Sequence, residues 1–172
     1  MVDEMLHIRE VLNNEIGWVR EQRVRAYEEH AQTVPIEHWN ALKRAILSDT
    51  DAQTGVEFLV AELDGEVVGS IVLYPAKSDA YDGLVDELDY PEIRMLAVSP
   101  NARSKGIAEK LVSECIKRAK QKEYKYIGLH TADFMTSAMR LYERIGFERQ
   151  PQFDFEPAND GIIVKAYRLA IE

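Results

Sequence analysis

The sequence predicts an α+β fold, on the strength of two observations. Runs rich in β-branched and aromatic residues and segments with helical spacing follow one another at irregular intervals, without the regular alternation of an α/β chain. Two of the β-rich runs are joined by Asp64-Gly65, which is the strongest short hairpin signal and predicts an antiparallel pair. A chain of 172 residues suits a single domain, and we expect one spanning 1–172.

The first half of the chain predicts one weak strand, two helices and the hairpin. Leu6 to Glu10 is the weak strand, and Pro35 suits the opening turn of the second helix. The helices are predicted from two sets of apolar residues at helical spacing: Ile16, Val19, Ala26 and Tyr27, then Trp39, Leu42 and Ile46. The hairpin strands are Val56 to Leu63 and Glu66 to Tyr74.

The second half predicts four further strands and two helices. A strand from Glu92 to Val98 stops before Pro100, and a helix begins near Gly106 and runs to about Gln121. After a strand from Tyr124 to Thr131 comes a helix closed by Gly146. The last predicted strand pair, turned by Asn159-Asp160-Gly161, covers Phe153–Phe155 and Ile162–Ile171.

The loop between Val98 and the following helix has the features of an anion cradle. The first turn of a helix offers unpaired N–H groups and the positive end of its dipole. Gly106 has no side chain to obstruct a phosphate group. The residues match neither the P-loop pattern nor the G-x-G-x-x-G fingerprint. What remains is Arg103-x-x-Gly106-x-Ala108, which resembles the acyl-coenzyme-A signature of the GNAT superfamily of N-acetyltransferases.

A second segment, Ser137 to Phe147, strengthens the resemblance. It is similar to the closing A-x-x-L-Y-x-x-x-G-F element of the same superfamily, and one apolar helix face is formed by Ala138, Leu141, Tyr142 and Ile145. The resemblance covers residues 56 to 172 well and the first fifty by general layout. It implies a mixed, mostly antiparallel sheet whose two central parallel strands, ending at Val98 and near Thr131, splay apart to admit acetyl-coenzyme A (acetyl-CoA).

The resemblance also implies roles for particular residues in binding that cosubstrate. The diphosphate would lie against main-chain N–H groups of the cradle, with charge added by two basic side chains. The pantetheine arm would pair with the exposed backbone at the end of the preceding strand, where free N–H groups could polarise the thioester carbonyl. The residues concerned are Leu96, Ala97, Val98, Arg103, Ser104, Lys105, Gly106, Ile107 and Ala108.

Acyl transfer to an amine also needs an acid and a base. The resemblance places Tyr142 as the general acid for the departing thiolate, although an apolar helix face alone favours a core tyrosine. Glu92 is the candidate base. Strand alternation predicts Glu92, Arg94, Leu96 and Val98 on one face, where Arg94 could pair with Glu92 and weaken it as a base. His130 and water are the alternatives.

The charge and composition of the chain limit the classes of molecule that it is expected to bind. With a net charge of −9 the chain is a poor match for nucleic acid, whereas a cationic acceptor is allowed. No apolar run could cross a bilayer, and the start of the chain lacks a secretion signal, so we expect a cytoplasmic location and no membrane partner. No residue spacing matches a metal site. The single Cys115 continues an apolar helix face, which predicts a packing role.

These observations predict an N-acetyltransferase that moves an acetyl group from acetyl-CoA to a primary amine by direct attack in a ternary complex. A small-molecule acceptor is favoured over a protein. The alternatives are a non-catalytic acyl-CoA sensor and an acetyltransferase of protein N-termini or lysines. The acceptor would lie near Glu15 to Leu47 and Ala76 to Pro91, where the acidic residues of 79–89 could attract a polyamine. The aromatic candidates are Trp39, Tyr74, Tyr81 and Phe134. A homodimer is compatible with the resemblance.

Overall fold

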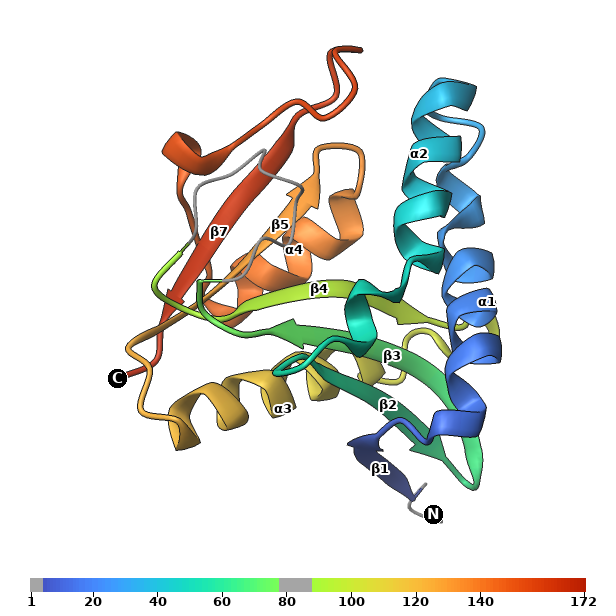
Figure 1. Ribbon diagram of the computed structural model, residues 1–172, viewed down its shortest axis with the longest axis vertical. Coiled ribbons are helices and arrows are strands. Elements are labelled where there is room, and N and C mark those ends of the chain that lie inside the picture. Colours follow the sequence, from blue (N-terminus) through green and yellow to red (C-terminus); the bar gives the residue numbers. More distant parts are fainter. Residues whose placement is uncertain (1–4, 78–87) are drawn as a thin grey trace.

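A computed structural model describes residues 5–77 and 88–172 of the chain. A seven-stranded sheet in the order β1-β2-β3-β4-β5-β7-β6 runs through the molecule (Figure 1). Its strands are β1 (Leu6–Glu10), β2 (Glu57–Leu63), β3 (Glu66–Tyr74), β4 (Glu92–Val98), β5 (Tyr126–Ala132), β6 (Glu148–Arg149) and β7 (Val164–Ala170). The helices are α1 (Ile16–Tyr27), α2 (Ile36–Leu47), α3 (Ile107–Gln121) and α4 (Thr136–Ile145). No helix in these two ranges is both long and apolar enough to span a bilayer.

The α+β prediction is confirmed, including the hairpin between β2 and β3. Every strand pair except β4 with β5 is antiparallel. The hairpin turn places both Asp64 (φ +50°) and Gly65 (φ +88°) in the left-handed region, as a tight two-residue turn requires. The turn therefore fixes which residues of the two strands lie opposite one another.

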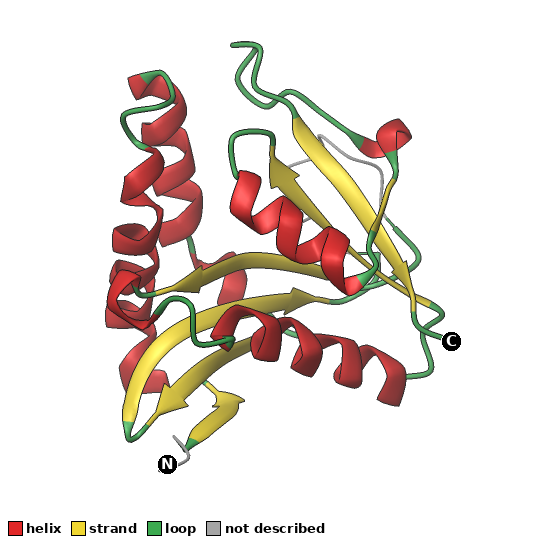
Figure 2. Cartoon of the chain, turned by 180° about the vertical axis from the view of Figure 1, so that it is seen from behind, coloured by secondary structure: helices red, strands yellow, loops and turns green. Residues whose placement is uncertain are grey.

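Helices cover both faces of the sheet (Figures 1 and 2). Alternating residues of β2 and β3 explain why. One set, Leu59, Ala61, Ile71 and Leu73, packs with α3 and α4 in the main core. The other set, Phe58, Val60, Val72 and Tyr74, packs with Val19 of α1 in a second cluster. Both faces of these strands are apolar, so a helix layer is needed on each side.

A β-bulge in β4 changes the direction of its side chains. Met95 has a φ of +60°, and the register with β3 shifts between Ser70 and Val72. Met95 packs in the cluster on the α1 side, whereas Leu96 and Val98 pack against the α3 core. The prediction that Glu92, Arg94, Leu96 and Val98 share one face is therefore wrong, because the bulge interrupts the alternation.

The predicted splay of the two central parallel strands is confirmed. β4 and β5 are paired only at Glu92↔Gly128 and Ile93↔Leu129, after which they separate. The ring of Tyr90 lies over Gly128, where a Cβ atom would come within 2.5 Å of Tyr90 Cε2. Beyond this point the backbone edge of β4 is left without a strand partner on the β5 side.

The end of the chain differs from the prediction. Instead of a strand over Phe153–Phe155, residues Pro151–Phe153 form a 3₁₀ turn, and only Phe155 bridges to Val164. The strand that pairs with the other side of β7 is β6, which the sequence did not predict. Two residues are too few for a period-of-two pattern to be recognised. Tyr81 and most of the acidic segment 79–89 lie outside the described residues.

A buried ion pair joins α1 to the segment after α2 and to the β4 bulge. Arg23 is fully buried, and its Nη1 donates to Asp51 Oδ2 at 3.1 Å and to the Ile46 carbonyl at 3.2 Å. The same nitrogen lies 3.1 Å from the sulfur of Met95. Arg20 provides Asp51 with a second cationic partner. Because both charges are out of water, each depends on the other.

The close contact at the start of the splay is testable with Gly128→Ala. A methyl group there must displace Tyr90 and press on the Tyr167 carbonyl, whose oxygen would lie 3.2 Å from the new Cβ atom. We expect a loss of about 1–3 kcal/mol in the free energy of unfolding, measured by urea denaturation. Gly17→Ala is the control, since nothing lies within 4 Å of its Cβ position in α1. Equal stability of the two variants would contradict the tight packing.

A second prediction concerns the buried pair. Asp51→Asn keeps the shape of the side chain but leaves Arg23 as an uncompensated buried cation. We expect a loss of about 3–5 kcal/mol in the free energy of unfolding. Glu62→Gln is the comparison, because the Arg9–Glu62 pair is partly exposed and should be worth about 1 kcal/mol or less. If both variants lost a similar free energy of unfolding, burial would not make the Arg23–Asp51 pair more important for stability than the partly exposed Arg9–Glu62 pair.

Candidate active site

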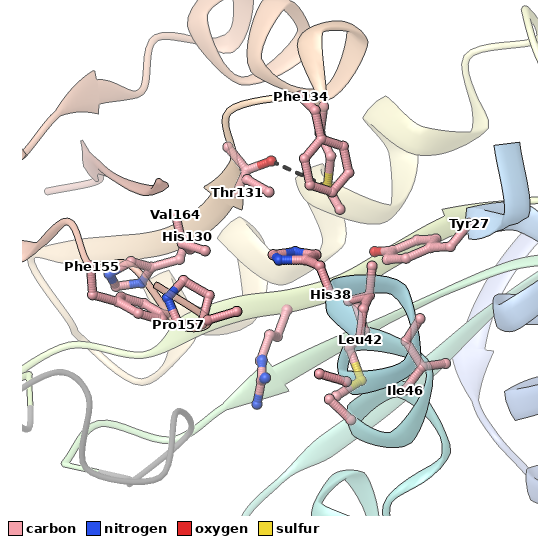
Figure 3. Close-up of a pocket in the computed structure, with 17 residues that line it drawn as sticks. Tyr27, His38, Leu42, Ile46, His130, Thr131, Phe134, Phe155, Pro157 and Val164 are labelled. Atoms are coloured by element: carbon pink, nitrogen blue, oxygen red, sulfur yellow. Dashed lines mark hydrogen bonds between the residues drawn. The ribbon is translucent and has the colours of Figure 1, made fainter. Parts of the chain in front are cut away.

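Two adjoining cavities lie where β4 and β5 separate. The first, of about 330 Å³, lies along the end of β4 and reaches α4, and we call it the splay cleft. The second, of about 250 Å³, lies between α2 and the segment before β7, and we call it the α2 pocket (Figure 3). Both cavities are lined by Tyr27, Arg94, Met95, His130, Thr131, Phe134 and Met135. A molecule in one cavity would therefore contact a molecule in the other.

The predicted cradle, residues 103–108, forms the loop and first turn that begin α3. Ser104 (φ +66°) and Gly106 (φ +77°) are both left-handed, and Gly106 is the residue immediately before the helix. Among the described residues, none accepts a hydrogen bond from the N–H groups of Gly106, Ile107 or Ala108. Nothing lies within 4 Å of the position that a Gly106 Cβ would occupy. The cradle thus offers free donors and open space to an anion.

The side chain of Arg103 turns away from the helix start toward α1. Its Nη2 donates to the Ala26 carbonyl at 3.0 Å, its Nε donates to the Val98 carbonyl at 3.3 Å, and its Nη1 pairs with Glu29. Arg103 also lines the splay cleft. It therefore joins the end of α1 to the end of β4 at the edge of this cleft.

The three predicted backbone residues of β4 all line the splay cleft. They are Leu96, Ala97 and Val98. The carbonyl of Leu96 accepts a hydrogen bond from the Tyr27 hydroxyl at 2.8 Å. Burial raises the pKa of Tyr27 to about 12, so this phenol keeps its proton at neutral pH. Tyr27 lines both cavities and was not singled out from the sequence as a site residue.

Tyr142 lies in the wall of the splay cleft, with a side chain that is 5% exposed. Its ring packs edge-on against Phe147, with the ring centroids 5.8 Å apart. Burial, with smaller contributions from Tyr27 and Cys115, raises the pKa of Tyr142 above the ordinary value for a phenol. The hydroxyl has no hydrogen-bond partner among the described residues. A protonated phenol at the cleft is suited to donate its proton.

Glu92 and His130 are brought together by the two paired residues of β4 and β5. Glu92 Oε2 lies 2.8 Å from His130 Nδ1, and His130 Nε2 lies 3.0 Å from the carbonyl oxygen of Phe153. A carbonyl only accepts, so Nε2 carries a proton. His130 lines both cavities, whereas Glu92 is buried and is not among the described residues that line either. Within the described part of the chain, Glu92 therefore reaches these two cavities through His130.

A second buried histidine–carboxylate pair was missed by the sequence analysis. His38, on α2, lies in the wall of the α2 pocket, and its Nδ1 is 2.8 Å from Asp160 Oδ2. Figure 3 shows the ring projecting from α2 toward Phe134, and the two ring centroids are 5.8 Å apart. The two residues are 122 positions apart in the sequence, and the only local signal was the turn Asn159-Asp160-Gly161, which says nothing of His38.

The aromatic candidates within the described residues differ in whether they line the cavities. Phe134 lines both cavities. Trp39 packs in the core between α1 and α2, and the hydroxyl of Tyr74 bonds to Thr50 at 2.8 Å. Cys115 is fully buried in the main core, and burial raises the pKa of its thiol, so the predicted packing role is confirmed.

The family follows from a comparison with known proteins. The model of the acetyltransferase (GNAT) family matches residues 18–147, which is most of the chain. The chain belongs to the GNAT family. This agrees with the resemblance seen in the cradle and in the Tyr142 segment, and the match extends over α1 and α2, where the sequence resembled the family only in layout.

Curated relatives are about a third identical to this chain over the aligned residues. An uncharacterized N-acetyltransferase of Escherichia coli K12, YjgM, is 33% identical over 97 residues, covering 56% of this chain and 54% of that protein. N-acetylaspartate synthetase of Xenopus tropicalis is 31% identical over 123 residues, covering 69% and 42%. The chain thus matches about half or less of the length of these relatives.

Solved GNAT structures have the same fold. PaiA N-acetyltransferase from Thermoplasma acidophilum, crystallised with coenzyme A, aligns with a TM-score of 0.70 at 17% identity over 96% of this chain and 99% of that one. A putative acetyltransferase from Salmonella typhimurium, YncA, crystallised with acetyl-CoA, gives 0.66 at 19% identity over 97% and 94%. These likenesses confirm the predicted GNAT-like fold.

The cradle can be tested with Gly106→Ala. The added methyl group meets no protein atom but would occupy the space open to a phosphate, so we expect the dissociation constant for acetyl-CoA to rise about tenfold or more in calorimetry. Gly65→Ala is the matched control. It has the same left-handed backbone (φ +88°) and the same open surroundings, but it lies at the hairpin turn. Equal affinities in both variants would show that Gly106 does not border the anion.

Proposed function

We propose that this GNAT protein transfers the acetyl group of acetyl-CoA to the primary amine of a small molecule, by direct attack within a ternary complex. The observation that carries the proposal is the pair of adjoining cavities. The splay cleft is lined by Arg103, the first residue of the cradle, by the open edge of β4 and by Tyr142, while the α2 pocket offers separate space for an acceptor. The walls that the cavities share would place the two substrates in contact.

The residues present fit acetyl-CoA. The free N–H groups of Gly106, Ile107 and Ala108 would bind the diphosphate. The edge of β4 at Leu96, Ala97 and Val98, which has no strand partner on the β5 side, would bind the amide groups of the pantetheine arm. When bound, the thioester supplies the activated acetyl group. Ser104 and the side chains of Arg103 and Lys105 complete the set of residues proposed to hold it.

Tyr142 is proposed as the acid that protonates the departing sulfur. Its raised pKa keeps the phenol protonated, and its hydroxyl is not committed to another described residue. Glu92 is proposed to act through His130, since its carboxylate reaches that imidazole and not the cavities. The Glu92–His130 pair would keep the wall shared by the splay cleft and the α2 pocket in a fixed position.

The α2 pocket favours a small acceptor with an apolar body. Its described walls are mostly aliphatic and aromatic side chains, and no aspartate or glutamate is among them. The described walls therefore offer a polyamine no carboxylate for its additional charges. A volume of about 250 Å³ suits a compact amine better than a folded protein surface.

The experiment is a panel of amines, including amino acids, arylalkylamines, polyamines, aminoglycosides and short peptides, assayed for release of free thiol from acetyl-CoA. We expect thiol release with compact amines that have an apolar body. If the protein were a sensor without catalysis, acetyl-CoA would still bind and raise the melting temperature of the protein. No thiol would then be released with any amine. That result would replace the enzyme proposal with the sensor.

The acid role is tested with Tyr142→Phe. Removing the hydroxyl should lower turnover about tenfold or more while leaving acetyl-CoA affinity nearly unchanged, because only the departing thiolate needs the proton. The control is Tyr167→Phe, another buried tyrosine, whose hydroxyl bonds to Glu143 outside both cavities. Turnover at the wild-type level in Tyr142→Phe would remove this residue from the mechanism.

A further inference from the structure

We propose that His38 removes the proton from the acceptor amine and that Asp160 orients its imidazole for this task. The proposal deepens the proposed function, because it rests on the α2 pocket being the acceptor site. It assigns a catalytic role to His38 and a positioning role to Asp160, neither of which belongs to the two segments that carry the family resemblance.

The position of His38 suits a base that acts on the acceptor. Its side chain is 6% exposed and lines the α2 pocket, whereas Tyr142 lines the splay cleft. The two cavities meet at shared walls, among them Phe134, against whose ring His38 packs edge-on. Acid and base would therefore approach the reacting atoms from different cavities, as a ternary complex requires.

Asp160 determines which nitrogen of His38 is free. Although partial burial works in the opposite direction, hydrogen bonds from the Ile162 N–H and from His38 hold the pKa of the Asp160 carboxyl below its usual range. An ionised carboxylate only accepts, so Nδ1 of His38 must donate its proton. In the neutral ring Nε2 then carries the lone pair, and it has no hydrogen-bond partner among the described residues.

The other two candidates for the base, His130 and Glu92, do not present a nitrogen or oxygen lone pair to the acceptor pocket. His130 has Nε2 on a carbonyl oxygen and Nδ1 on Glu92, so neither nitrogen offers a lone pair to an amine. Glu92 is buried behind His130, away from the described cavity walls. Of the three side chains, His38 alone combines a place in the acceptor pocket with an uncommitted nitrogen.

The proposed step conserves protons and electrons. The ammonium group of the acceptor gives one proton to Nε2 of His38, and Asp160 balances the charge of the resulting imidazolium. The freed nitrogen lone pair forms a bond to the acetyl carbon, the carbon–sulfur bond breaks, and its electron pair goes to sulfur, which takes the Tyr142 proton. The second amine proton restores the phenol through water, and His38 returns its proton to solvent.

We expect Asp160→Asn to reverse the tautomer of His38 while keeping the shape of the side chain at position 160. The Ile162 N–H donates to Oδ1 at 3.1 Å, which keeps an acceptor oxygen at that position and turns the new amide nitrogen toward His38. Nδ1 must then accept, so the proton moves to Nε2 and the lone pair facing the pocket is lost. We expect kcat to fall about tenfold or more with the dissociation constant of acetyl-CoA unchanged.

The matched control is Asp133→Asn. Asp133 likewise accepts a backbone hydrogen bond, from the Ile163 N–H at 3.1 Å, and it lines neither cavity as described. We expect wild-type turnover in this variant. A loss equal to that of Asp160→Asn would attribute both effects to disturbance of the 160–163 segment and would overturn the role of Asp160.

Nitrogen NMR of the imidazole rings tests the tautomer without any acceptor. The chain has four histidines, and His38→Gln identifies the signals of His38. At about pH 8, above the usual titration range of imidazole, we expect the Nδ1–H form in the wild type and the Nε2–H form in Asp160→Asn. An Nε2–H or doubly protonated His38 in the wild type would overturn the proposal.

The base role is tested by His38→Gln with two amines that the wild type acetylates, an alkylamine and an arylamine of similar size that is added to the panel. An alkylamine is protonated in the assay and needs a base, whereas an arylamine is already neutral. We expect a loss of about tenfold or more for the alkylamine and a much smaller loss for the arylamine. Equal losses, or none, would remove His38 as the base while leaving the acetyltransferase proposal intact. A wild-type protein that acetylates no amine would instead refute the proposed function itself.

Discussion

The separation of β4 from β5 is the constraint on which the rest of the structure depends. Pairing at Glu92↔Gly128 and Ile93↔Leu129 holds the strands together, and the bulge at Met95 then turns β4 away. The splay costs hydrogen bonds that a continuous ladder would have made, but it leaves a backbone edge that can bind an extended ligand. The cradle follows directly from the end of this strand, so under the proposed function the open edge and the cradle would contact successive parts of one acetyl-CoA molecule.

Hydrogen-bonded pairs of ionisable side chains position the surrounding helices and loops on this frame. Arg23 and Asp51 tie α1 to the bulge, Glu92 and His130 connect the two central strands, and His38 and Asp160 connect α2 to the segment before β7. A buried polar or charged group without its partner costs free energy, so each pair specifies an arrangement of elements that apolar contacts alone would leave less defined. The cavities lie among these pairs, with mostly apolar walls in the α2 pocket.

The accuracy of the sequence analysis depended on how local each signal was. The hairpin at Asp64-Gly65, the start of α3 at Gly106 and the cap at Gly146 are set by a few adjacent residues, and all three were located. The face of β4 was misjudged because alternation assumes an unbroken strand, and the Met95 bulge breaks it. The strand predicted over Phe153–Phe155 failed for a related reason, since Pro151 begins a 3₁₀ turn there and the true partner strand is too short to show a pattern.

By itself, then, the sequence determined the class of fold, the family and the place of the cradle, because backbone conformation and helix capping are decided within a few residues. Tertiary structure decided which ionisable groups meet. Glu92 reaches His130 across 38 positions, and His38 reaches Asp160 across 122. No local pattern records such contacts, because the side chains are brought together only when the sheet and its covering helices pack. Which atoms of the site carry protons is therefore decided by the tertiary structure and not by any local sequence pattern.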